Sequence, residues 1–413
     1  MPAFVGRVQG KIKVEKLSTV YADNAATTAM SRTAVEAMLP YLDKIYGNPS
    51  SLHSVGQVAK EALEAARADM AACLGAKPDE IYFTSCGSES DNQAIRSAAH
   101  LGALKGKKHI ISTAFEHHAV LHTLKRLEKE EGFEVTLLDV HANGVITADE
   151  VKAAIRPDTC LVTVMFANNE IGTVQPIKEI GEVCRAAGVT FHTDAVQAVG
   201  HIPVNVVEQN IDMLSLSAHK FHGPKGIGVL FCRRGLRLLP FIDGGAQERG
   251  RRAGTENIAE IVSMAAALKE ACANMQANSA KLIKMRDRII SELVKIPHSK
   301  LNGDMAHHLP GTINMCFEGI EGEGLLLLLD DKGICASSGS ACTSGSLDPS
   351  HVLLAIGLPH EVAHGSLRLS LSEYNTEEDA DRIIKAVPEV VEYLRNMSPV
   401  WKELERGEKP HLL

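Results

Sequence analysis

Short apolar runs alternate with helical patterns through the middle of the chain, from about residue 60 to residue 275. Apolar residues recur at three- and four-residue spacing over 54–74, 118–131 and 177–187, as on one face of a helix. The candidate strands are 81–85, 109–113, 134–139, 161–167, 190–194, 213–217 and 228–232. This alternation predicts an α/β fold: a mostly parallel sheet of about seven strands with helices on both faces.

The pattern changes after a helical stretch that runs from Glu256 to about residue 295. Shorter strand candidates at 311–316 and 366–371 are separated by helical patterns at 323–330 and 350–356. We therefore expect a large domain formed by residues 30–275. Residues 1–29 and 276–413 would form a smaller α+β domain.

Composition excludes several classes of protein. The 413 residues carry a formal net charge of -8, which argues against a nucleic-acid partner. The longest purely apolar run, 325–329, is far shorter than the roughly 20 residues of a membrane helix. Nine scattered cysteines without a Cys-x-x-Cys pair argue against disulfides or a zinc site and favour a reducing cytoplasm.

The residues that directly follow the predicted strands are the first candidates for function, because ligands of open α/β sheets bind at the carboxyl ends of strands. Gly87 and Ser88 open a helical pattern, where backbone N–H groups and a hydroxyl can bind a phosphate. His117 can stack on a flat ring or move a proton, and Asn169 can bond a ring hydroxyl. Taken singly, each is equally explained as a helix cap, a solvated histidine or a turn residue.

Two charged residues complete this set. Asp194 ends an apolar strand and is followed by Gln197, and a buried carboxylate needs a partner such as a protonated pyridinium nitrogen. Lys220 lies in a small, glycine-bounded turn, where desolvation lowers the pKa of a lysine and makes its amine nucleophilic. Together the five strand ends match the needs of pyridoxal 5'-phosphate (PLP), whose ring acts as an electron sink.

Two motifs carry a resemblance to a known family: Ser-Ala-His-Lys at 217–220 and Asp-Ala-Val-Gln at 194–197. Both look like motifs of the fold-type I PLP enzymes in the aminotransferase class V group. Within that group the chain resembles the NifS/IscS-type cysteine desulfurases almost end to end, from Tyr21 to Ser370. The resemblance implies a PLP-dependent sulfurtransferase that converts L-cysteine to L-alanine.

The resemblance also implies roles for individual residues. Catalysis would fall to Lys220, His117 and Cys342, and the substrate carboxylate would bind Arg368 with help from Asn48. Thr255 would reach the cofactor phosphate from the other subunit, which implies a homodimer. The implied cofactor-binding residues are Gly87, Ser88, His117, Asn169, Asp194, Gln197, Ser217, His219, Lys220 and Thr255.

The stretch 336–347 is rich in Gly and Ser and carries the thiol of Cys342. Such residues cannot bury a core, so we expect a mobile loop, and we interpret the preceding Cys335 as structural. In the family the cysteine of this loop attacks the substrate sulfur and becomes a persulfide. The sequence resembles the long-loop group, which implies transfer to an acceptor such as an Fe-S scaffold protein of the NifU/IscU kind.

Three other functions remain open at this point. A selenocysteine lyase or a cysteine sulfinate desulfinase would use the same lysine and carboxylate, although the cysteine-bearing loop favours sulfur. A PLP aminotransferase would need no loop cysteine. A non-catalytic partner that retains the fold would bind no cofactor.

Overall fold

The computed structural model describes residues 19–338 and 349–413. A seven-stranded sheet in the order β2-β8-β7-β6-β5-β3-β4 lies at its centre. Of these strands β8 alone runs opposite to the others, so the sheet is mostly parallel. The strands are β2 (Ile81–Thr84), β3 (His109–Thr113), β4 (Glu134–Leu138), β5 (Thr159–Thr163), β6 (Thr190–Asp194), β7 (Met213–Ser217) and β8 (Gly228–Cys232). The predicted fold class is confirmed.

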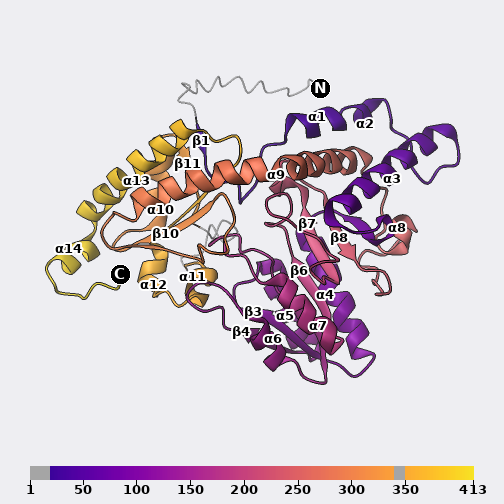
Figure 1. Cartoon of the computed structure of the whole chain (residues 1–413), viewed down its shortest axis with the longest axis horizontal. Helices are drawn as coiled ribbons and strands as arrows, with labels where there is room; N and C mark the ends of the chain where they lie inside the picture. The colour runs from indigo at the N-terminus through magenta and orange to yellow at the C-terminus, as the bar shows by residue number, and fades with distance from the viewer. Residues whose placement is uncertain (1–18, 339–348) are drawn as a thin grey trace, which may run out of the picture.

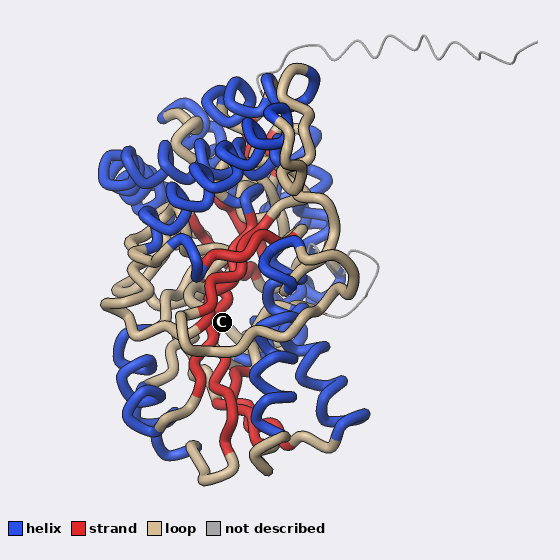
Figure 2. Tube along the Cα trace, turned by 90° about the vertical axis from the view of Figure 1, so that its right-hand side faces the viewer, coloured by secondary structure: helices blue, strands red, loops and turns tan. Residues whose placement is uncertain are grey.

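Both faces of this sheet are covered by helices, as Figure 2 shows. Strand β8 illustrates why its sequence is apolar throughout: Val229 and Phe231 enter one core, whereas Leu230 and Cys232 enter another. Successive side chains of a strand point to opposite faces, so a strand buried on both faces shows no polar alternation. The helices of this part are α3 (Ser54–Leu74), α4 (Gly87–Ala103), α5 (His118–Glu131), α6 (Ala148–Ala154) and α7 (Ile177–Ala187).

A second group of elements has its own core. It contains an antiparallel sheet in the order β12-β10-β9 and a parallel pair of β1 with β11. Val20 of β1 pairs with Ile334 of β11, which brings the start of the described chain onto this core. The elements are β1 (Val20–Tyr21), β9 (Ser299–Leu301), β10 (Thr312–Phe317), β11 (Ile334–Cys335), β12 (Ser366–Ser370), α10 (Gly322–Asp331) and α13 (Glu377–Met397).

The long helix α9 (Ile258–Leu293) joins the two groups, as Figure 1 shows. Its first half, including Met264 and Leu268, packs in the core of the large sheet. Its second half, including Met285 and Ile289, packs in the core of the small sheet. We propose that the boundary between the two predicted domains lies inside α9, near residue 275.

The remaining described elements are short. They are α1 (Arg32–Met38), α2 (Pro40–Asp43), α8 (Gln247–Gly250), α11 (His351–Ala355), α12 (His360–His364), α14 (Pro399–Glu405) and the 3-10 turns η1 (Pro78–Glu80) and η2 (Ala218–Lys220). None of the helices in the described part of the chain has the length and apolar character needed to cross a bilayer.

Candidate active site

A cavity of about 350 Å³ lies at the carboxyl ends of the parallel strands. Most of the predicted site residues meet there, because the loops after β2, β3, β5, β6 and β7 open on the same edge of the sheet. Those lining the cavity are Gly87, Ser88, His117, Asn169, Asp194, Gln197, Ser217, His219, Lys220 and Arg368.

Asp194 is the buried carboxyl group at the end of β6. Its Oδ1 accepts a hydrogen bond of 2.9 Å from the Val196 N–H. Burial raises the pKa of Asp194, while the charges of His117 and Lys220 oppose that rise. A cation bound beside this carboxyl group would favour the ionised form, so Asp194 fits the protonated ring nitrogen of PLP.

The amine of Lys220 is held by main-chain carbonyl groups of the segment that follows β1. Its Nζ donates to the oxygens of Ala25 and Ala26 at 2.6 and 2.8 Å. The amide of Gln197 also donates to Ala25, at 3.0 Å. Lys220 therefore projects from η2 towards the segment that contains Ala25 and Ala26, which completes the cavity wall.

The N-terminus of α4 provides the donor groups for an anion. The N-cap residue Cys86 makes no side-chain cap, which leaves first-turn N–H groups to a ligand. A Cβ atom on Gly87 would lie 2.7 Å from Val196 Cγ2, so this close approach needs glycine. Burial lowers the pKa of His219 to about 4, so its neutral ring offers a hydrogen bond rather than a charge. Ser88 and His219 fit the phosphate of PLP.

His117 is the N-cap residue of α5 and lies beside the buried carboxyl groups. Its Nδ1 accepts a hydrogen bond of 3.1 Å from the Ala119 N–H, which places the proton of the neutral ring on Nε2. One ligand atom each of His117, Asp91 and Asp194 lies within 4.8 Å of the others. The ring can therefore exchange a proton within the cavity.

Arg368 comes from β12 and places its guanidinium group in the wall of the cavity. Although 2% exposed, it lines the cavity. It donates to the Asn169 oxygen at 3.0 Å and pairs with Asp23 at 2.8 Å. Its Nε has no partner among the described residues. A buried guanidinium with an unused donor suits a carboxylate ligand.

Several cavity residues were missed by the sequence reasoning. Asp91 lies in α4 one turn beyond Gly87, and Glu170 directly follows Asn169. Glu170 is buried and accepts a short hydrogen bond from the hydroxyl of Ser350. The same strand-end argument would have found Glu170. His351 and Asp91 carry no such local signal.

Two predicted residues, Asn48 and Thr255, are not brought into the cavity, and a third cannot be placed because it is not among the described residues. Asn48 is exposed between α2 and α3, where it accepts a hydrogen bond from the Ser50 N–H. Thr255 lines a separate pocket of about 160 Å³ beside Gly226. Cys342 lies outside the described residues. Their roles stay predictions.

This fold and this cavity define the class of protein: the chain belongs to the aminotransferase class-V family, whose model matches residues 20–383. Within it the similar proteins are cysteine desulfurases. The chain is 55% identical to cysteine desulfurase IscS of Methanosarcina thermophila over 92% of this chain and 94% of that one. It is 52% identical to a cysteine desulfurase of a Nostoc species over 95% of this chain and 97% of the relative.

Solved structures agree with this grouping. A structure titled NIFS-LIKE PROTEIN matches with a TM-score of 0.85 and 38% identity, over 91% of this chain and all of that chain (100%). A NifS-like protein from Rickettsia africae matches with a TM-score of 0.81 and 30% identity, over 91% of this chain and 99% of that one. The predicted resemblance is therefore confirmed.

Proposed function

We propose that this protein is a PLP-dependent cysteine desulfurase that converts L-cysteine to L-alanine and holds the sulfur as a persulfide on Cys342. The observation that carries this proposal is the meeting of Asp194, Lys220 and Arg368 in one cavity. A ring-binding carboxyl group, an amine and a carboxylate-binding guanidinium are the three groups that a PLP enzyme needs for an amino-acid substrate.

The residues present fit PLP as a group. Asp194 would hold the ring nitrogen, His117 would stack on the ring, and Asn169 with Gln197 would bond its hydroxyl group. The α4 N-terminus would hold the phosphate. When bound, PLP supplies an aldehyde for the lysine and a ring that withdraws electrons from the substrate α-carbon. The phosphate donors would be Gly87, Ser88, Ser217, His219 and the partner's Thr255.

The side chains of the chain divide the remaining work. Arg368, which lines the cavity, would bind the cysteine carboxylate and fix the orientation of the α-carbon. The amine of Lys220 would take the proton from that carbon, and His117 Nε2 would move protons to and from the substrate. The site thus holds a base, an orienting cation and a proton carrier.

Sulfur transfer would fall to Cys342. Its thiolate would attack the substrate sulfur, so that an S–S bond forms while the C–S bond breaks. The electron pair of the broken bond stays with carbon, which takes up a proton and leaves as alanine. No external oxidant is needed, because the transferred sulfur is oxidised as the carbon is reduced.

We also propose a homodimer that passes its sulfur to a protein acceptor of the NifU/IscU Fe-S scaffold kind. Thr255 lies outside the cavity of its own chain, as a residue supplied to the other subunit would. Exposed apolar side chains also gather within residues 35–58, and a partner subunit could cover them: Val35, Leu39, Leu42, Tyr46, Leu52, Val55 and Val58. Every cysteine in the described part is a free thiol, which supports a reducing compartment such as the cytoplasm.

The decisive experiment measures alanine release and protein-bound persulfide after cysteine is added to the PLP-loaded protein. The wild type should give both products, and Cys342→Ser should lose them while it still binds PLP. Cys335→Ser is the matched control and should keep both. Full sulfur transfer by Cys342→Ser would overturn the proposal. A preference for selenocysteine, or amino transfer to a keto acid, would instead support the other enzyme classes.

A further inference from the structure

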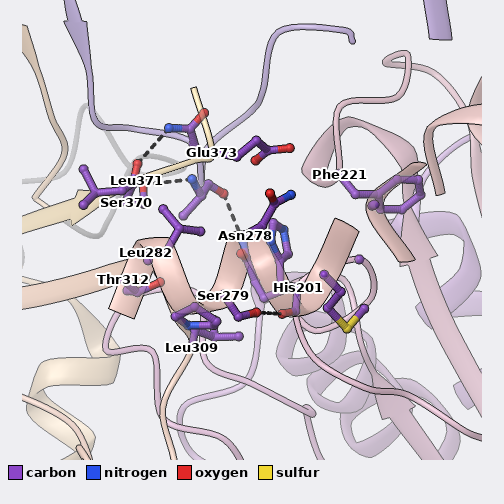
Figure 3. Close-up of a pocket in the computed structure, with 18 of the residues that line it drawn as sticks. His201, Phe221, Asn278, Ser279, Leu282, Leu309, Thr312, Ser370, Leu371 and Glu373 are labelled. Carbon is purple, nitrogen blue, oxygen red and sulfur yellow. Dashed lines mark hydrogen bonds between the residues drawn. The ribbon is translucent and has the colours of Figure 1, made fainter. Parts of the chain in front are cut away.

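A second cavity, of about 40 Å³, lies next to the active-site cavity and shares Ala25 and Gln197 with it. Figure 3 shows its lining, where residues of α9 face the lysine turn and the segment that follows β12. This space is too small for a substrate and has room for about three waters. Its buried polar residues are therefore candidates for holding the surrounding segments together.

His222 on the lysine turn is the central polar residue of this cavity, and its contacts fix its charge. Its Nδ1 lies 2.8 Å from the Ala29 carbonyl oxygen, and its Nε2 lies 3.3 Å from Glu373 Oε2. The Ala29 carbonyl oxygen can only accept, and so can Glu373 while it is ionised, so a ring with a proton on each nitrogen suits both neighbours. The Nε2 contact is an ion-pair distance, since Nε2 makes no hydrogen bond within the described part of the chain.

The electrostatic balance agrees with this assignment. Burial lowers the pKa of His222, but Glu373 together with the Ala29 carbonyl group and the charge of Glu270 outweighs burial, so the pKa lies above its ordinary value. Burial raises the pKa of Glu373, but the contact with His222 and its charge act in the opposite direction. The net effect is a lowered pKa of Glu373. Both shifts favour the charged forms, as expected for an ion pair.

Other titratable groups face His222 from each neighbouring element. Glu270 of α9 adds a negative charge. The Tyr374 ring meets the imidazole edge-on at 4.8 Å. Loss of water around the partly buried His201 lowers its pKa, and its Nε2 lies 2.9 Å from the Lys220 carbonyl oxygen. His201 is neutral and Glu270 is acidic. Among the groups that face one another here, His222 is therefore the one that carries the positive charge.

The pair links two parts of the active site that lie far apart in the sequence. His222 follows Lys220 by two residues, with a φ of 63° that is unusual for a side chain larger than glycine. Its N–H donates to Thr28 Oγ1 at 2.9 Å. Glu373 follows β12, the strand that carries Arg368. A shift of either segment would change the distance between the amine and the guanidinium.

We propose that His222 and Glu373 are positioning residues, whose ion pair holds the Lys220 turn against the segment after β12 while His222 is charged. The functional part of this inference rests on the proposed desulfurase activity. The charge of the pair does not, because it can be measured on the protein without cofactor or substrate.

The first test is an NMR titration of the His222 ring Cε1–H in the cofactor-free protein, in the wild type and in Glu373→Gln. The wild type should titrate above the ordinary histidine range. Glu373→Gln should titrate below it, since burial then acts with less opposition. An unchanged midpoint would overturn the ion pair.

The second test is the pH profile of cysteine turnover. The alkaline limb of Glu373→Gln should move to lower pH, with kcat/KM about 10-fold lower at neutral pH, because misplaced reacting groups lose rate steeply. The matched control is Glu131→Gln, which removes the charge from the partly buried His100–Glu131 pair of 2.7 Å outside both cavities. This variant should keep the wild-type profile.

The two tests separate the possible failures. A shifted titration with an unchanged pH profile would overturn the positioning role. An inactive wild type would count against the proposed function, and the titration would still decide whether the ion pair exists.

Discussion

At the scale of single residues, the active-site cavity is surrounded by more carboxyl groups than cations. Burial raises the pKa of Asp91 well above its ordinary value, and the charge of Asp194 raises it further. Burial raises the pKa of Glu116 to about 8. Asp194 differs because His117 and Lys220 oppose the rise. Asp194 and Glu170 thus have basic neighbours that favour their charged forms, whereas burial and the charge of Asp194 both raise the pKa values of Asp91 and Glu116.

Glu116 makes this electrostatic argument testable. Its pKa is raised from 4.5 to about 8, so the stability it contributes is complete below pH 4.5 and is lost as pH rises towards 8. The amide oxygen of Glu116→Gln can still accept hydrogen bonds from Thr113 and Met165. This variant should therefore keep those contacts but lose the pH dependence, a slope in the free energy of unfolding on the order of 1 kcal/mol per pH unit. Unfolding of the cofactor-free protein between pH 5 and 9 measures this. An unchanged slope would contradict it, and the exposed Glu128→Gln is the control.

Arg368 is the second residue with a clear prediction. Arg368 reaches Asn169 and Asp23 from two different nitrogens, whereas a lysine has its donors on a single nitrogen and cannot present the planar fork that matches a carboxylate. Arg368→Lys should raise KM for cysteine about 10- to 100-fold, the value of a charge-assisted hydrogen bond. Steady-state kinetics of cysteine turnover measure this change in KM, with the exposed Arg288→Lys as the control. A change in kcat alone would argue against carboxylate binding.

At the scale of elements, the start of α4 depends on a close approach by β8. A Cβ atom on Gly228 would lie 2.7 Å from the Leu216 oxygen and 2.8 Å from the Cys86 carbonyl carbon. Gly228→Ala must therefore move the turn that precedes the N-terminus of α4, where we propose that the phosphate binds. We expect a loss of about 1–3 kcal/mol of stability together with weaker PLP binding.

Thermal unfolding and PLP titration measure both effects of Gly228→Ala. The control is Gly324→Ala in α10, where the new methyl group would lie 3.4 Å from Leu394 in ordinary contact. That variant should gain up to about 1 kcal/mol from helix propensity. Equal stability of the two variants would contradict the proposed close approach.

The elements also show where sequence reasoning succeeds. The predicted helices 54–74, 118–131 and 177–187 match α3, α5 and α7 to the residue. Each has a regular apolar spacing and ends at a glycine in the left-handed region, namely Gly75, Gly132 and Gly188. Periodicity with a clear stop signal is a local property, so it is readable from the sequence.

Elements that depend on distant partners were less predictable. The predicted strand 161–167 is β5, Thr159–Thr163, because the chain beyond it leaves the ladder and Ala167 bridges to Val174. Strands β1, β9 and β11 have two or three residues each and exist only through pairing with remote segments. Runs of that length carry no measurable period.

The candidate site divides in the same way. Gly87, His117, Asn169, Asp194 and Lys220 were found because sheet topology places strand ends together. The pairing of Glu373 with His222 and of Ser350 with Glu170 depends on how segments far apart in the sequence pack together. No local pattern in the sequence encodes that packing.

At the scale of the whole molecule, the active-site cavity draws on both halves of the fold. Lys220 and Asp194 come from the large sheet, whereas Arg368 comes from β12 of the small sheet. The segment after β1 closes the cavity, since the carbonyl oxygens of Ala25 and Ala26 accept hydrogen bonds from the Lys220 amine. A site assembled this way should be lost when the two halves separate, even if each keeps its secondary structure.

The proposed homodimer leads to a prediction about mixed subunits. If Thr255 serves the partner's cavity, Lys220→Ala and Thr255→Ala homodimers should each have low activity. In a mixed dimer, the subunit that keeps Lys220 would receive a native threonine from its neighbour. Random exchange of equal amounts should restore about a quarter of the wild-type sites, since half of the dimers are mixed and each has one intact site. Refolding the two variants together and measuring alanine release tests this.

The control for that experiment is a mixture of Lys220→Ala with Arg368→Ala. Both side chains line the same cavity of one chain, so no mixed dimer has an intact site and no activity should return. Recovery in this control would mean that subunits share the lysine or the arginine as well. Absence of recovery in the Thr255 mixture, with dimers verified by sedimentation, would place Thr255 outside the partner's site. The two mixtures together therefore decide which side chains cross the dimer interface.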